Sequence, residues 1–175
     1  MIDNPVTRLH ARAIIKRLEI RPGMRVLDVG TGPGRLAIPL ARYVGHSGEV
    51  VAVDISPRMI QRLERRADKA GITNIRTVVG GAGTGVDWGG DFDLAILASV
   101  LGEIDPARRD AALSEINGAL KPGGALAVVE AKPDPDFQRP AAVRAAAEKA
   151  GFELKRSQRL WTGFMSQFVK ADNRA

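Results

Sequence analysis

The chain has 175 residues, of which 45% are apolar and 26% charged, and its formal net charge is +6 at pH 7. This balance is typical of a single globular domain and excludes a disordered chain. The absence of cysteine excludes disulfides, thiolate metal sites and a cysteine nucleophile. No apolar run is long enough to span a bilayer, and no signal-peptide layout opens the chain, so we expect a cytoplasmic protein.

The positive charge could indicate an anionic partner such as nucleic acid. Between Arg58 and Lys69, however, the basic residues alternate with apolar ones at helical spacing, as on a solvated helix face. Nucleic acid is therefore our second choice of partner, after a small molecule. The two histidines, His10 and His46, form no metal-binding spacing, so we expect no metal.

Strands and helices alternate along the first half of the chain. Asn4 and Pro5 begin a predicted amphipathic helix that ends at Leu18, and residues 1–20 are a candidate lid. Glycine and proline signals separate the elements that follow. We predict strands over residues 25–29, 49–54 and 75–79, and helices over residues 35–43 and 57–70.

The second half begins with a glycine-rich loop over residues 80–93 and continues the alternation. Lys121-Pro122-Gly123-Gly124 is predicted to be a tight turn. We predict strands over residues 92–98, 125–130, 152–160 and 164–171, and helices over residues 106–120 and 141–150. Such alternation predicts one α/β domain, residues 1–175, with a mostly parallel sheet and helices on both faces.

The segment from Val26 to Gly34 carries the most information about function. A strand, a glycine turn and a helix let backbone amides approach a ligand closely. Asp54 closes the next strand, 24 positions after Gly30, where a carboxylate can accept hydrogen bonds from both ribose hydroxyls. Together these features predict a cofactor that contains a nucleoside.

The glycine spacing argues against a dinucleotide. The dinucleotide fingerprint G-x-G-x-x-G requires a third glycine where this chain has Arg35. Here the spacing is G-x-G-x-G, and Asp28 stands two residues before the first glycine. A carboxylate at that position suits a ligand with positive charge, such as the ammonium and sulfonium groups of S-adenosylmethionine.

These motifs resemble those of the class I methyltransferases that use S-adenosylmethionine, most closely the small-molecule branch related to ubiquinone and menaquinone biosynthesis. The resemblance covers roughly residues 20 to 170 and continues through Phe92-Asp93-Leu94, Leu120-Lys121-Pro122-Gly123-Gly124, Glu130-Ala131-Lys132-Pro133 and Ala150-Gly151-Phe152. It implies a three-layer Rossmann-like fold, whose seven-stranded, mostly parallel sheet has an antiparallel last strand. It also implies methyl transfer to a small-molecule acceptor.

The resemblance implies that the glycine turn holds the amino-acid part of the cofactor and that Asp54 binds the ribose. Ile55 and Met59 would pack near the adenine or ribose. Gly81 and Ala82 would lie along the adenine edge, and Ser99 would face the methionine portion. The cofactor-binding set implied in this way is Asp28, Gly30, Thr31, Gly32, Gly34, Asp54, Ile55, Met59, Gly81, Ala82 and Ser99.

Two departures from the family limit this inference. Gly80 to Gly83 offer no acidic side chain for the adenine amine, and Gly102 stands where many relatives carry histidine, so the catalytic residue is unknown. Glu130 could form a structural hydrogen bond or contact the substrate. Trp161 and Phe164 could form an apolar acceptor pocket with the amino-terminal helix, or Trp161 could cover the core.

Other functions stay open. An RNA or protein methyltransferase would use the basic surface, and a non-catalytic module would bind S-adenosylmethionine without turnover. A nicotinamide-dependent dehydrogenase is disfavoured by Arg35, and cytosine C5 methylation in its usual form by the missing cysteine. A homodimer is compatible with all of these readings.

Overall fold

The computed structural model describes residues 11–171, and the chain divides into two compact units, Met1–Gly80 and Gly81–Ala175. No described helix is long and apolar enough to cross a membrane. The single domain expected over residues 1–175 stays a prediction. The predicted amino-terminal helix and lid lie partly outside the described residues; within them, residues 11–15 are helical and bury Ala11, Ile14 and Ile15.

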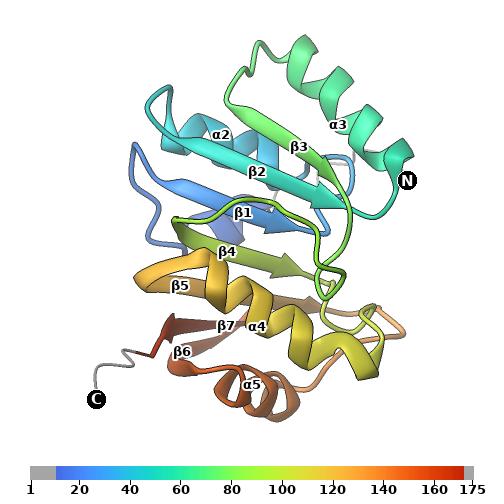
Figure 1. The fold of residues 1–175 in the computed structure, drawn as a ribbon, viewed down its shortest axis with the longest axis vertical. Helices are drawn as coiled ribbons and strands as arrows, with labels where there is room; N and C mark the ends of the chain where they lie inside the picture. Colours follow the sequence, from blue (N-terminus) through green and yellow to red (C-terminus); the bar gives the residue numbers. More distant parts are fainter. Residues whose placement is uncertain (1–10, 172–175) are drawn as a thin grey trace. The chain divides into compact units, whose positions relative to one another are not determined.

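From β1 onward, the first unit alternates three parallel strands with two helices. These elements are β1 (Arg25–Val29), α2 (Ala37–Val44), β2 (Glu49–Asp54), α3 (Pro57–Lys69) and β3 (Ile75–Val79). Both β1 and β3 pair with β2, and α3 packs along β2 and β3, as Figure 1 shows. The four central residues of β2 are fully buried, as expected of a strand between two parallel neighbours.

Helix α3 shows why the local sequence folds in this way. The hydroxyl of Ser56 accepts a hydrogen bond from the amide of Met59, and Pro57 occupies the first turn. Ile60, Leu63 and Ala67 are buried at helical spacing, so one face of α3 packs on the sheet. Among the remaining positions Arg58, Arg65 and Lys69 are exposed, which supports the interpretation of this basic stretch as a solvated helix face.

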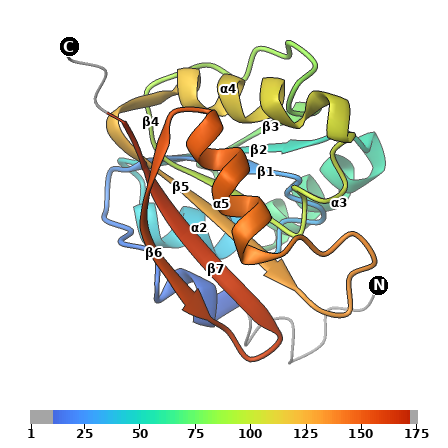
Figure 2. The same ribbon diagram turned by 90° about the horizontal axis from the view of Figure 1, so that it is seen from below.

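Up to residue 171, where the described chain ends, the second unit contains four strands, a 3-10 turn and two helices. These elements are β4 (Phe92–Ala98), η1 (Pro106–Arg108), α4 (Arg109–Ala119), β5 (Leu120–Ala131), α5 (Pro140–Lys149), β6 (Phe152–Arg159) and β7 (Gly163–Lys170). Strands β4 and β5 are parallel, whereas β7 pairs antiparallel with both β5 and β6. Helix α5 packs against the β6–β7 hairpin, as Figure 2 shows.

The strand order is β3-β2-β1 in the first unit and β4-β5-β7-β6 in the second, and helices flank the strands of each unit. The predicted fold class, a mostly parallel Rossmann-like sheet with antiparallel pairing at its last strands, is therefore confirmed. All seven predicted strands exist, and most of their boundaries agree with the structure within one residue.

Two predicted boundaries were wrong. The residues predicted as a tight turn, Lys121 to Gly124, belong to β5: Phe92 pairs with Leu120 but Leu94 pairs with Ala125, so the intervening residues bulge out of the ladder. Pro122 cannot donate to the ladder, which is why the chain bulges there. Helix α2 begins at Ala37 and not near Arg35, because the glycine turn extends to Leu36.

Candidate functional site

The turn after β1 is built around glycines in the left-handed region, where φ is 69° at Gly30, 54° at Gly32 and 78° at Gly34. Gly34 is buried, and a Cβ added there would lie 2.2 Å from Leu63 Cδ1 of α3, so this glycine allows the turn to pack against the helix. At Gly32, by contrast, nothing lies within 4 Å of an added Cβ. The turn therefore packs at Gly34 and leaves open space at Gly32.

Asp54, at the carboxyl end of β2, holds this turn in place. Its Oδ2 accepts a hydrogen bond from the Gly32 amide at 2.8 Å, and its Oδ1 accepts one from the Ser56 amide at 2.8 Å. The amides of Gly30 and Thr31 donate to the Val53 carbonyl at 2.8 and 2.9 Å. A carboxylate has about four lone-pair sites, so the half-buried Asp54 keeps capacity to accept further hydrogen bonds from a ligand.

Asp28 is only 2% exposed and has partners within its own unit. Its Oδ2 accepts a hydrogen bond from the Thr31 hydroxyl at 2.7 Å, and the backbone amide of Ala37 also bonds to it. Burial raises the pKa of Asp28 to about 7; the charge of Asp54 adds to this rise, and the bonds from Thr31 and Ala37 oppose it. Asp28 thus bonds both the glycine turn and the start of α2, and it can gain charge when a cation binds.

Exposed apolar side chains stand beside Asp54. Ile55 is 76% exposed, and Val79, the parallel partner of Asp54 on β3, is 51% exposed. Met59 is partly exposed on the first turn of α3. The sequence predicted Ile55 and Met59 but not Val79. Val79 could have been found from its place at the end of β3, the strand that follows Asp54 in the chain. These side chains offer an apolar surface that suits a flat heterocycle.

The other predicted cofactor contacts, Gly81, Ala82 and Ser99, lie in the second unit, and their part in cofactor binding stays a prediction. The loop after Gly81 is held by Glu115 of α4, whose carboxylate accepts hydrogen bonds from the amides of Gly83 at 2.7 Å and Gly85 at 3.0 Å. Sequence reasoning missed this support, because Glu115 lies far along the chain. Ser99 follows β4 with φ of 55°, an uncommon conformation for a residue with a side chain.

Glu130 near the end of β5 is the other buried acid of the described residues, at 1% exposure. Its Oε2 accepts a hydrogen bond from the Gln138 amide at 3.2 Å, whereas its Oε1 has no hydrogen-bond partner. Burial raises the pKa of Glu130 to about 7, opposed by the Gln138 bond and by Arg109, and aided by Asp134 and Glu103. One carboxylate oxygen of Glu130 is hydrogen-bonded and the other is not. A buried carboxylate with a purely structural role would normally have partners for both oxygens.

The structure rejects one of the two readings of Trp161. This side chain is 87% exposed in the turn between β6 and β7, so it does not cover the core. Phe164 is buried at the start of β7, and both residues line a pocket of the second unit. Among the described residues, no group of three or more histidine, aspartate or glutamate side chains could hold a metal ion.

Residues 26–124, more than half of the chain, match the methyltransferase domain family. The chain belongs to this family, and the resemblance inferred from the glycine turn and Asp54 is confirmed. The fold, the turn and the family model together define the class of this chain as a methyltransferase domain.

The curated relatives indicate which branch of the methyltransferases this chain resembles. The chain is 33% identical over 136 residues to the ubiquinone/menaquinone biosynthesis C-methyltransferase UbiE of Shewanella pealeana, which covers 77% of this chain and 53% of the relative. It is 36% identical over 137 residues to the enzyme of the same name from Shewanella baltica, with the same coverage. The chain thus spans about half the length of the curated relatives it matches.

Solved structures agree with this assignment. A methyltransferase of Aquifex aeolicus, described as dependent on S-adenosylmethionine, superposes with a TM-score of 0.81 at 25% identity, over 97% of this chain and 95% of that one. A TehB-like methyltransferase of Corynebacterium glutamicum superposes with a TM-score of 0.73 at 24% identity, over 91% of this chain and 86% of that one. The second likeness concerns the fold alone.

Proposed function

We propose that this chain transfers a methyl group from S-adenosylmethionine to a small-molecule acceptor. The observation that carries the proposal is the carboxylate of Asp54, which fixes the Gly32 amide at 2.8 Å beside a turn that leaves open space. A nucleoside cofactor fits this arrangement, because a carboxylate at the strand end can accept from ribose hydroxyls while the turn admits the ligand.

The protein's own residues would bind and orient the cofactor. Asp54 would accept hydrogen bonds from the ribose, Ile55, Met59 and Val79 would cover the adenine, and the charge of Asp28 would attract the ammonium and sulfonium groups. When bound, S-adenosylmethionine supplies an activated methyl group with a good leaving group, so the protein mainly needs to align donor and acceptor. A general base is required only where the acceptor must lose a proton.

The remaining predicted contacts belong to the same proposal. Gly30, Thr31 and Gly34 would shape the turn around the methionine portion, Gly81 and Ala82 would lie along the adenine, and Ser99 would face the methionine. We also propose a single domain and a cytoplasmic location, with homodimerisation as an accompanying prediction. A small-molecule acceptor is supported by the likeness to UbiE, a C-methyltransferase of ubiquinone and menaquinone biosynthesis. The basic face of α3 is the feature that would favour an RNA or protein acceptor instead.

Incubation of the purified protein with methyl-labelled S-adenosylmethionine and fractionated cell extract tests this proposal. We expect label to enter the fraction of small organic-soluble molecules and to be absent when Asp54→Ala protein is used. Label in the RNA or protein fraction would instead support the alternative acceptors. Absence of transfer to every fraction, despite measurable cofactor binding, would leave a cofactor-binding module and contradict the proposed activity.

A further inference from the structure

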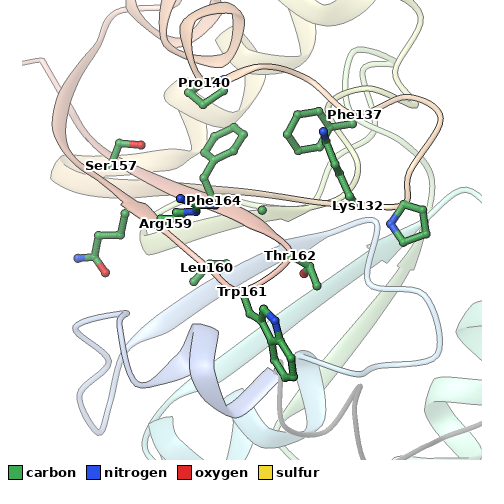
Figure 3. Close-up of a pocket in the computed structure, with 12 residues that line it drawn as sticks. Lys132, Phe137, Pro140, Ser157, Arg159, Leu160, Trp161, Thr162 and Phe164 are labelled. Atoms are coloured by element: carbon green, nitrogen blue, oxygen red, sulfur yellow. The ribbon is translucent and has the colours of Figure 1, made fainter.

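A pocket with a volume of about 690 Å³ lies in the second unit. It is formed by the loop between β5 and α5 and by the β6–β7 hairpin, as Figure 3 shows. Pockets of this volume hold small organic ligands. Its lining residues come from Lys132 to Pro140 and from Ser157 to Phe164.

Aromatic rings and other apolar groups form much of the pocket wall. The rings of Phe137 and Phe164 meet edge to face, with their centroids 5.9 Å apart and an interplanar angle of 89°. Phe164 is buried, whereas Phe137 is partly exposed and could cover one side of a flat ligand. In Figure 3 Phe137, Phe164 and Pro140 lie on the same side of the hairpin.

The charged side chains among the twelve lining residues are both cations, Lys132 and Arg159. The Lys132 ammonium lies 5.3 Å from the centroid of the Phe137 ring, so one of these cations stands directly beside the aromatic wall. Arg159 pairs in register with Phe164 across the hairpin, which places both side chains on one face of the sheet. The pocket wall therefore carries two cations, and none of its twelve lining residues is acidic.

The buried acid next to this wall offsets that positive charge only in part. Glu130 pairs in register with Phe164 from the other side, so Glu130, Phe164 and Arg159 form one row across three strands. Burial raises the pKa of Glu130 to about 7, so much of its population is neutral near neutral pH. The nearby loop acid Asp134 uses its Oδ1 to accept from the Asp136 amide at 2.9 Å and does not line the pocket.

We propose that this pocket is a binding site for a small aromatic carboxylate, whose ring lies against Phe137 and Phe164 and whose negative charge is attracted by the two cations of the wall, Lys132 and Arg159. The inference goes beyond the proposed methyl transfer and is independent of it, because binding requires no S-adenosylmethionine. Charge complementarity selects the anion, and the aromatic wall selects the flat ring.

Calorimetric titration of the whole chain with 2-naphthoate and its uncharged analogue 2-naphthamide tests the site without added cofactor. We expect naphthoate to bind with at least tenfold higher affinity than naphthamide, since charge-assisted hydrogen bonds are stronger than those between neutral groups. The double variant Lys132→Gln with Arg159→Gln should abolish this preference while retaining the weak binding of the amide.

Matched variants distinguish the contribution of the pocket's cations to binding from that of its aromatic wall. Lys149→Gln removes an exposed cation of α5 that does not line the pocket, and should leave the affinity for naphthoate unchanged. Phe137→Leu should weaken both ligands about equally, because it removes aromatic wall and no charge. Thermal melts would show that the exposed substitutions leave the fold intact. Equal affinity for naphthoate and naphthamide, loss of binding in Lys149→Gln, or no naphthoate binding at millimolar concentration would overturn the proposal.

Discussion

Replacement of Asp54 by alanine is expected to weaken the binding of S-adenosylhomocysteine by about 100-fold or more. The variant loses an acceptor for the ribose hydroxyls, and it also leaves the amides of Gly32 and Ser56 without the carboxylate that orders the turn. Hydrogen bonds to a charged group contribute about 1.5–3 kcal/mol each, and about 2.7 kcal/mol corresponds to 100-fold in affinity. Calorimetric titration of the purified variant measures the change.

Two further variants test whether the loss of affinity in Asp54→Ala is specific to the Asp54 carboxylate. Asp68→Ala removes an exposed carboxylate from α3 and should leave the affinity within about twofold of wild type. Asp54→Asn keeps the size and one oxygen acceptor, so its affinity should fall between those of wild type and Asp54→Ala. Wild-type affinity in folded Asp54→Ala protein would remove Asp54 from the cofactor site.

Replacement of Asp28 by asparagine should have opposite effects on stability and on cofactor binding. Burial raises the pKa of Asp28 from 3.8 to about 7 in the folded protein, so at intermediate pH the folded state holds a proton that the unfolded chain has released. Stability therefore falls as the pH rises from about 4 to 7, and above pH 7 the full cost of a buried charge persists. Asparagine stays neutral and avoids this cost.

We expect Asp28→Asn to raise Tm at pH 8 by several degrees, since about 1 kcal/mol corresponds to roughly 3 °C in a protein of this size. At pH 5 the difference should be smaller, because Asp28 is then protonated, and therefore neutral, in the folded protein. The same variant should bind S-adenosylmethionine about tenfold more weakly at pH 8, because the attraction for its positive charges is lost. Differential scanning calorimetry and titration at both pH values measure the two effects.

A lower Tm for Asp28→Asn at pH 8 would show that the ionised carboxylate stabilises the fold through Thr31 and Ala37 more than its burial costs. Binding by the wild type gives an independent test. Because a cationic ligand favours the ionised form of Asp28, its binding near pH 7 should release protons, detectable as a buffer-dependent heat. Identical heats in buffers of different ionisation enthalpy would contradict this role of Asp28.

Local sequence signals were sufficient to predict the strands and the glycine turn. β2 is a continuous apolar run that ends at Asp54, and α3 begins with Ser56 and Pro57. The residues at the ends of these elements therefore mark their boundaries in the sequence. The error at Lys121 to Gly124 has a physical reason. Proline and glycine signal a turn locally, but the pairing of Leu120 with Phe92 extends β5 across this segment, and no local pattern records that pairing.

Within the candidate site, the residue types were predictable and their surroundings were not. Asp54 and the glycines follow from spacing, whereas the burial of Asp28 against Thr31 and Ala37, which raises its pKa, depends on how the turn packs. The support of the Gly83 and Gly85 amides by Glu115 joins segments that are distant in sequence. Contacts of this kind arise from tertiary packing, and one sequence read alone contains no periodicity that would reveal them.

Calorimetric titration of the wild-type chain with S-adenosylhomocysteine and, separately, with NAD tests the central claim most directly. The proposed site predicts one equivalent of S-adenosylhomocysteine bound with a dissociation constant of about micromolar order, near −8 kcal/mol, and no measurable heat with NAD. Binding of NAD without binding of S-adenosylhomocysteine would contradict the assignment of the glycine turn and Asp54 to a sulfonium cofactor.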